Sequence, residues 1–131
     1  MPRTRIHIDG ERFHDIPTFY DEINRIFMED EDWKIGQSLD ALNDVLHGGF
    51  GPIRGAEELD LIWRNFEKSR SDLGYDAMHR HLSAKLDQPT RFNIAKIQQD
   101  LENLERAGHP TYFDIILEII ADHPNIRLIE E

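Results

Sequence analysis

WKIGQSLDALNDVLHGGFG, residues 33–51, predicts a loop, a short helix and a glycine stop. Ser38 can cap the start of the helix, because its hydroxyl can accept a hydrogen bond from a free amide of the first turn. Leu39, Leu42 and Leu46 recur at helical spacing and form one apolar stripe. This stripe indicates the face on which the helix packs against the rest of the chain.

Two acids, Asp40 and Asp44, lie four residues apart on this helix, so they share a face that points away from the apolar stripe. Like charges at this spacing repel by roughly 0.2–0.5 kcal/mol, and only an acid in the first turn gains from the helix dipole. The helix provides no cation beside them, which predicts a positively charged partner. Their exposed setting offers no desolvated pocket that would separate the two pKa values, so the pair does not favour general acid–base catalysis.

The composition is typical of a soluble globular protein. The chain has 131 residues, enough for a single domain, 1–131, with a real hydrophobic core. It has no cysteine, which excludes disulfides and thiolate metal sites and agrees with a reducing cytoplasm. We expect neither a membrane span, which needs about 18 apolar residues in a row, nor a secretion signal, because MPRTRIHIDG at the start lacks an apolar core.

The formal net charge of −11 at pH 7 is the property that bears most on partners. An acidic surface of this kind repels nucleic acid and anionic membranes and attracts basic proteins. The acids at residues 29–32, EDED, either form a solvated loop or speed the capture of a basic partner. Solubility alone is the alternative explanation of the charge. We expect a cytoplasmic monomer that binds no cofactor, metal or nucleic acid.

Hydrophobic periodicity along the chain predicts both strands and helices. The strands are residues 4–8, 59–63 and 125–129, and the helices are residues 17–28, 38–47, 64–73, 75–86, 94–104 and 111–122. Strands separated by helical crossovers indicate an α/β fold with a small parallel or mixed sheet and helices packed on it. Two helices within residues 75–110 are expected to form an antiparallel pair that lies on the domain. Thr111 and Asp114 form a loose capping box at the start of the last helix.

The histidines and buried aromatic positions have simpler interpretations than a chemical site. His79 and His81 lie two residues apart on a helix and point in different directions, which favours a surface pair over a metal site. His47 lies in the last turn of its helix, where a cation helps the dipole, or else it touches a partner. Trp63 and Phe66 are expected in the core.

Three blocks of the sequence resemble the barstar-like family, whose prototype is an intracellular inhibitor of a secreted bacterial ribonuclease. They are IDGE at residues 8–11, GQSLDALNDVL at residues 36–46 and LIWRNFEKS at residues 61–69. The second block is the most specific. The resemblance implies a three-stranded parallel sheet packed with helices, with residues 75–110 as an additional helical insertion.

In that family the second helix and the loop before it fill the active site of the ribonuclease, and carboxylates take the place of the RNA phosphate. By position, Asp40 and Asp44 match the two helix acids, Asp44 the more important one, and Gly36 matches a loop glycine that lets the backbone approach the enzyme. Glu118 matches an acid that makes a peripheral ion pair. The resemblance implies a basic ribonuclease or ribonuclease toxin domain as partner, with Trp33, Gly36, Ser38, Asp40, Asn43, Asp44 and Glu118 as the partner-binding residues.

The chain departs from the prototype at several of these positions. Lys34 and Ile35 replace paired tyrosines, Ser38 replaces an asparagine, and Asn43 replaces a tryptophan between the acids. Trp33 is the aromatic side chain nearest to the replaced tyrosines. The target therefore need not be the prototype's ribonuclease, and the alternative is an interaction module of the same fold with no nuclease target. The third hypothesis, an enzyme, is disfavoured.

Overall fold

A parallel three-stranded sheet forms the base of the molecule. The computed structural model describes residues 4–29, 31–47, 58–88 and 93–131, and the glycine stop expected after residue 47 lies outside this part. The strands are β1 (Thr4–Asp9), β2 (Leu59–Arg64) and β3 (Ile126–Glu130), in the order β1-β2-β3. Both pairings are parallel, with Leu61 opposite Ile6 and Leu128. The predicted α/β fold is confirmed, and the sheet is parallel rather than mixed.

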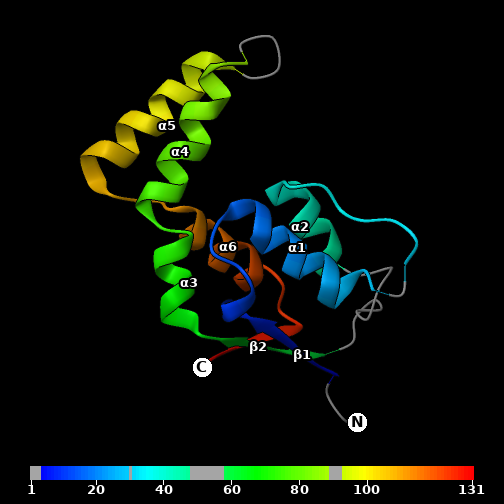
Figure 1. The fold of residues 1–131 in the computed structure, drawn as a ribbon. Coiled ribbons are helices and arrows are strands. Elements are labelled where there is room, and N and C mark those ends of the chain that lie inside the picture. The colour runs from blue at the N-terminus through cyan, green and yellow to red at the C-terminus, as the bar shows by residue number, and fades with distance from the viewer. Residues whose placement is uncertain (1–3, 30, 48–57, 89–92) are drawn as a thin grey trace.

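The helices lie on one side of this sheet (Figure 1). They are α1 (Ile16–Phe27), α2 (Leu39–His47), α3 (Phe66–Asp72), α4 (Tyr75–Leu86), α5 (Ile94–Ala107) and α6 (Tyr112–Ala121), with a 3₁₀ turn at Gly10–Arg12. The capping box of Thr111 and Asp114 at the start of α6 is confirmed. Helix α1 has a second capping box, made by Asp15 and Thr18, and therefore begins one residue before the expected Pro17.

A charged residue, Asp60, lies buried in the central strand at 3% exposure. The sheet register places it between Arg5 of β1 and Arg127 of β3. Arg127 donates two hydrogen bonds to its carboxylate, of 3.1 and 2.9 Å, and Arg5 lies 4.0 Å away. The carboxylate is therefore paired, as a buried charge must be, and a slip in strand register would break these contacts.

Trp63 is the centre of the core and is fully buried. Its ring stacks on Phe19 at 6.0 Å and meets Phe66 and Phe113 edge-on at 5.7 and 5.4 Å. Its indole N–H donates to the Ser69 hydroxyl at 2.8 Å, so the one polar atom of the ring is satisfied. The expectation that Trp63 and Phe66 belong to the core is confirmed.

Two of the three sequence blocks that carry the resemblance, the first and the third, contact each other. A Cβ at Gly10 would lie 2.6 Å from the Arg64 carbonyl oxygen and 2.7 Å from the Ser69 hydroxyl, so only glycine fits where the first block meets the third. Lys68, from the third block, donates to the carbonyl oxygens of Gly10 at 3.0 Å and Phe13 at 2.8 Å. These two blocks therefore hold the first turn against β2 and α3, whereas the middle block both packs in the core and presents exposed residues on α2.

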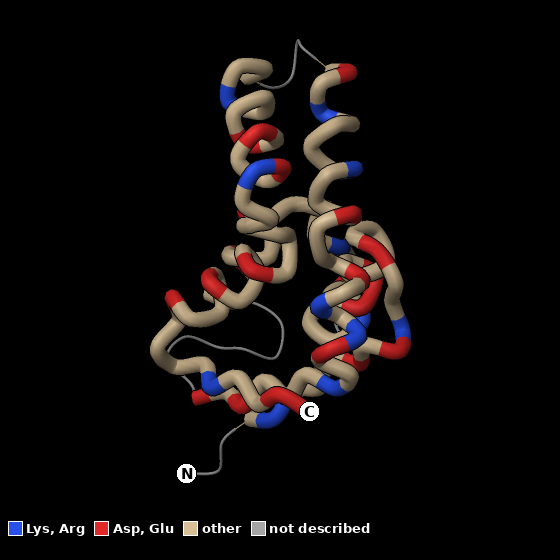
Figure 2. Tube along the Cα trace, turned by 90° about the vertical axis from the view of Figure 1, so that its left-hand side faces the viewer, with Lys and Arg blue, Asp and Glu red and all other residues tan. Residues whose placement is uncertain are grey.

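Helices α4 and α5 form an arm that projects from the body, as Figures 1 and 2 show from two sides. The expected antiparallel pair is present, but its expected position on the domain is wrong. The buried residues of α5, Ile97, Leu101 and Leu104, form a single stripe, which α4 alone is enough to cover. The two ends of the arm meet at the body, where the Phe113 amide donates to the Leu73 carbonyl at 2.9 Å.

His81 lies at the base of the arm. It was expected on the surface, but its side chain is half-buried. Its ring contacts Tyr112 edge-on at 5.2 Å, and the Tyr112 hydroxyl lies 2.6 Å from the Tyr20 hydroxyl. Burial, and to a lesser extent the charge of Lys85, lowers the pKa of His81 from 6.5 to about 4. The folded protein therefore keeps His81 neutral under conditions in which the unfolded chain takes up a proton.

This difference gives the free energy of unfolding a dependence on pH. Between pH 6.5 and about 4 the unfolded chain binds the extra proton, so stability should fall as the pH is lowered through this window. In His81→Phe the ring cannot titrate, and we expect a shallower decline between pH 7 and pH 4.5. Urea unfolding curves at several pH values measure how the free energy of unfolding changes with pH in the wild type and in the variant. The same pH dependence of the free energy of unfolding in wild type and variant would contradict this account.

Candidate partner-binding surface

Helix α2 has one buried face and one exposed face. Leu42, Val45 and Leu46 are buried, and α2 packs on α6. The predicted cap is confirmed, because the Ser38 hydroxyl accepts from the Ala41 amide at 3.1 Å. Val45 was not part of the predicted stripe, whereas Leu39 is only half-buried. The apolar contacts fix how α2 is oriented and leave its other face to solvent.

The exposed face carries Asp40, Asn43 and Asp44. Within the described ranges, neither carboxylate has a hydrogen-bond or ion-pair partner. Each can therefore accept hydrogen bonds from an arginine, lysine or protonated histidine of another molecule, and such charge-assisted bonds are roughly twice as strong as neutral ones. A rigid helix that presents two ionised carboxylates is suited to bind a positively charged site.

The loop before α2 is held in place by Asn24 of α1. The side-chain oxygen of Asn24 accepts from the Ile35 amide at 2.8 Å, and its nitrogen donates to the Ile35 carbonyl at 3.4 Å. The Ile35 side chain is buried at 8% exposure, so this residue, one of the two that replace tyrosines, belongs to the core. The loop is therefore preorganised at its middle, and the sequence alone gave no sign of the contact with Asn24.

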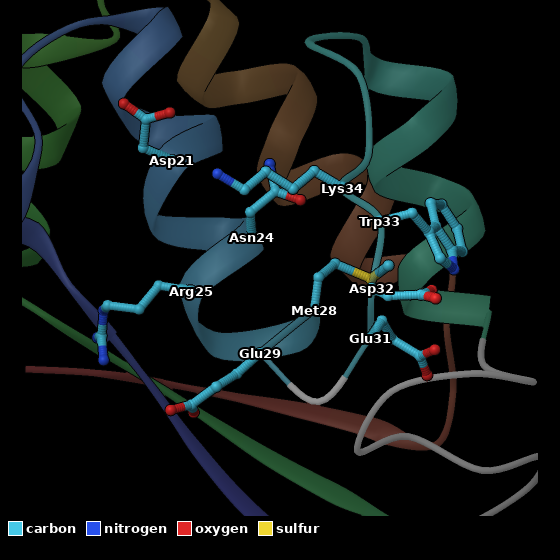
Figure 3. Close-up of a pocket in the computed structure, with 9 residues that line it drawn as sticks. All are labelled: Asp21, Asn24, Arg25, Met28, Glu29, Glu31, Asp32, Trp33 and Lys34. Atoms are coloured by element: carbon cyan, nitrogen blue, oxygen red, sulfur yellow. The ribbon is translucent and has the colours of Figure 1, made fainter.

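Trp33 is one of two large apolar side chains that are exposed in the described part of the chain, at 48%. It lies on the rim of a hollow of about 470 Å³ between α1 and the loop, shown in Figure 3. Glu29, Glu31 and Asp32 line the same hollow, while Asp30 is outside the described residues. Arg25 and Lys34 line the hollow as well, so it carries charges of both signs beside Trp33.

Gly36 is not required by the fold. A Cβ at this position would meet no atom within 4 Å, and the backbone is not in the left-handed region that favours glycine. This distinguishes Gly36 from Gly10, which is packed against backbone. A folding argument therefore explains Gly10 but leaves Gly36 without a structural reason.

Asn43 is oriented by a residue distant in the sequence, His123. The His123 Nε2 and the Asn43 side-chain oxygen form a hydrogen bond of 2.9 Å, which holds the Asn43 side chain toward the histidine. The ring of His47, placed in the last turn of α2 as expected, lies 6.2 Å from that of His123. Burial, followed by the proximity of His47, lowers the pKa of His123. No local sequence signal marks His123, because it lies beyond α6 and reaches α2 only in the folded protein.

The structure places the predicted binding residues on one loop and two adjacent helices. Trp33, Gly36, Ser38, Asp40, Asn43 and Asp44 lie on the loop and α2, and Glu118 is exposed on α6, against which α2 packs. The described residues contain no cluster of three or more histidines or acids placed to hold a metal. Among them there is also no helix long and apolar enough to cross a membrane.

Comparison with known proteins identifies the family of the chain. A family model described as Barstar (barnase inhibitor) matches residues 3–84. No curated protein matches the chain. The matched range begins before β1 and ends within α4, so it includes the loop and α2, whereas α5, α6 and β3 lie beyond it.

Proposed function

Because the chain belongs to the Barstar (barnase inhibitor) family, we propose that it inhibits a basic ribonuclease by covering the enzyme's active site with α2 and the loop before it. The active site of such an enzyme must attract the phosphates of RNA and therefore carries positive charge. In the proposed complex Asp40 and Asp44 take the place of these phosphates. Inhibition is then steric and electrostatic, and one inhibitor molecule binds one enzyme molecule. It needs no catalytic group on this chain.

The observation that carries the proposal is the pair of exposed carboxylates on an anchored helix. Removing two charges from water is costly, and it is offset only when ionic partners and hydrogen bonds replace the water. Helix α2 is fixed by Leu42, Val45 and Leu46, so little conformational freedom is lost when its acids bind. The net charge of −11 adds long-range attraction toward a basic enzyme and favours fast association.

Gly36 gives independent support. The fold offers space for a side chain at this position, so its absence is explained by an event outside the free protein. Close approach of a partner's surface to the backbone at residue 36 is such an event, because any Cβ there would hold the partner away. In this proposal Trp33, Ser38, Asn43 and Glu118 surround the central contact and select among ribonucleases.

The proposal is tested by RNA cleavage. Barnase and a panel of small basic bacterial ribonucleases are assayed on a fluorogenic RNA with increasing amounts of the purified protein. We expect at least one enzyme to lose its activity at a one-to-one ratio. If every enzyme of the panel remains active at micromolar inhibitor, ribonuclease inhibition is contradicted, and an interaction module of the same fold replaces it.

The target is proposed to differ from the prototype's ribonuclease in the groups that surround the central contact. Ile35 is part of the core and cannot reach a partner, and Asn43 already forms a hydrogen bond with His123. The inhibitor would protect its own cell, either from the cell's secreted ribonuclease or from a toxin domain delivered by neighbouring cells. The same contact serves both purposes.

A further inference from the structure

A groove runs between the arm and the proposed binding surface. A cleft of about 690 Å³ has Gln37, Ser38 and Asp40 on one side and Ala84, Lys85 and Gln88 on the other. A smaller hollow of about 280 Å³ adjoins it, since Gln37 and His81 line both. Helix α4, in green in Figure 1, therefore forms one wall of a groove whose opposite wall is the start of α2.

The α4 wall is a single helical face. Ala77, His81, Ala84 and Lys85 line these hollows and recur at intervals of three and four residues, which places them on one side of a helix. Two of them are alanines, and small side chains leave room beside the helix. Ala84 is exposed and Ala77 is buried, so the groove is closed at the base of the arm and open toward its tip.

We propose that this groove receives a surface loop of the bound ribonuclease, so that the α4–α5 arm forms a second part of the inhibitory interface and determines which enzyme is recognised. This inference rests on the proposed function, because it assigns an additional contact to the same complex. Its occupant is a polar loop that places a basic residue toward Asp40 and an acidic residue or carbonyl oxygens toward Lys85.

Continuity of the surface is the first argument. Ser38 and Asp40 belong both to the proposed binding surface and to the wall of the groove. An enzyme that covers Asp40 must therefore lie across the mouth of the groove. Residues of α4 line the same cleft as Asp40, and the arm projects from the body (Figures 1 and 2), so a globular partner on α2 meets α4 unless its own surface is recessed there.

The size of the interface is the second argument. A stable protein–protein interface engages about 20–30 residues on each side. Helix α2 has nine residues and three of them are buried. The helix and its loop are too small to provide such an interface alone, and the α4 face is an adjacent surface with open space in front of it.

Charge is the third argument, and it defines the occupant. One wall carries Asp40 and the other carries Lys85, while the rings of His81 and Tyr112 line the groove between them. Burial keeps His81 neutral, because its pKa is lowered to about 4. Walls of opposite charge over uncharged rings suit a polar loop with both kinds of charge better than an apolar helix.

Matched substitutions on the two helices of the arm test the inference. Ala84→Trp fills the groove, whereas Ala95→Trp makes the same change at an exposed position of α5 that does not line it. The probe is barnase, or the enzyme of the panel that the wild-type protein inhibits most strongly. We expect Ala84→Trp to raise Kd at least tenfold and Ala95→Trp to change it less than twofold.

A charge-reversal pair repeats the test without adding bulk. Lys85→Glu and Lys96→Glu change the net charge equally, so long-range attraction shifts equally in both, but Lys96 lies on α5 beside Asp100. Only Lys85→Glu should weaken the complex, and circular dichroism confirms that each variant is folded. If the wild-type protein inhibits but the two variants of each matched pair have the same Kd, the arm contact is wrong and ribonuclease inhibition stands. If wild type inhibits no enzyme, both proposals fall.

Discussion

Asp44→Ala should weaken the complex with the target ribonuclease more than any other single substitution on this surface. In the proposed complex the Asp44 carboxylate is desolvated against the enzyme's catalytic cations. Removing it leaves those cations buried without a counter-charge, which costs roughly 3–5 kcal/mol, or roughly a 150- to 5000-fold increase in Kd. Stopped-flow association and dissociation rates measure the effect, which should lie mainly in dissociation.

Glu29→Ala is the matched control for this prediction. It removes the same unit of charge from an exposed position in the hollow that Trp33 also lines. Because Glu29 is proposed to act only through the long-range field, its loss should slow association a few-fold at low salt and little at high salt. Equal and small effects of both substitutions on Kd would show that α2 does not occupy the active site.

Trp63→Ala should have the largest effect on stability. The side chain is fully buried and contacts four aromatic rings, those of Phe13, Phe19, Phe66 and Phe113. Replacement leaves a cavity and removes the hydrogen bond to Ser69, at a cost of roughly 3–5 kcal/mol. Since a domain of this size is stable by about 5–15 kcal/mol, this loss is a large fraction of the free energy of unfolding and should clearly lower the unfolding midpoint.

Trp33→Ala is the comparison for Trp63, and the chain has no other tryptophan. Trp33 is 48% exposed on the loop, so its removal should change the free energy of unfolding by about 1 kcal/mol or less. Guanidinium unfolding followed by far-UV circular dichroism measures both variants. Similar midpoints would mean that Trp63 does not centre the core, and the described packing of β2 would be wrong.

The periodic features of the fold were predictable from the sequence. Strands and helices follow from apolar spacing, and the Ser38 cap and the capping box of Thr111 and Asp114 follow from local hydrogen-bond chemistry. These features depend on residues within one turn of each other. The same holds for the amphipathic character of α2, which predicted that Asp40 and Asp44 would be exposed.

The contacts that orient the candidate site were not predictable, because they join distant parts of the chain. His123 reaches Asn43 across 80 positions, and Asn24 binds Ile35 across 11. Glu22 appears as one polar residue of α1 in the sequence, yet it is 2% exposed and paired with Arg25 at 2.7 Å. Periodicity specifies a helix face but not which side chain of another element will meet it, so the direction of the arm was also missed.

The meeting of Leu73 and Phe113 has a consequence for how such inhibitors can diversify. The chain leaves the body after Leu73 and returns to it at Phe113, and the backbone hydrogen bond between these residues holds the two ends of the arm together. The entropy of closing such an excursion rises only slowly with its length. Arms of other lengths and sequences can therefore be grafted at these residues, and in the proposed complex such an exchange would direct the same body toward another enzyme.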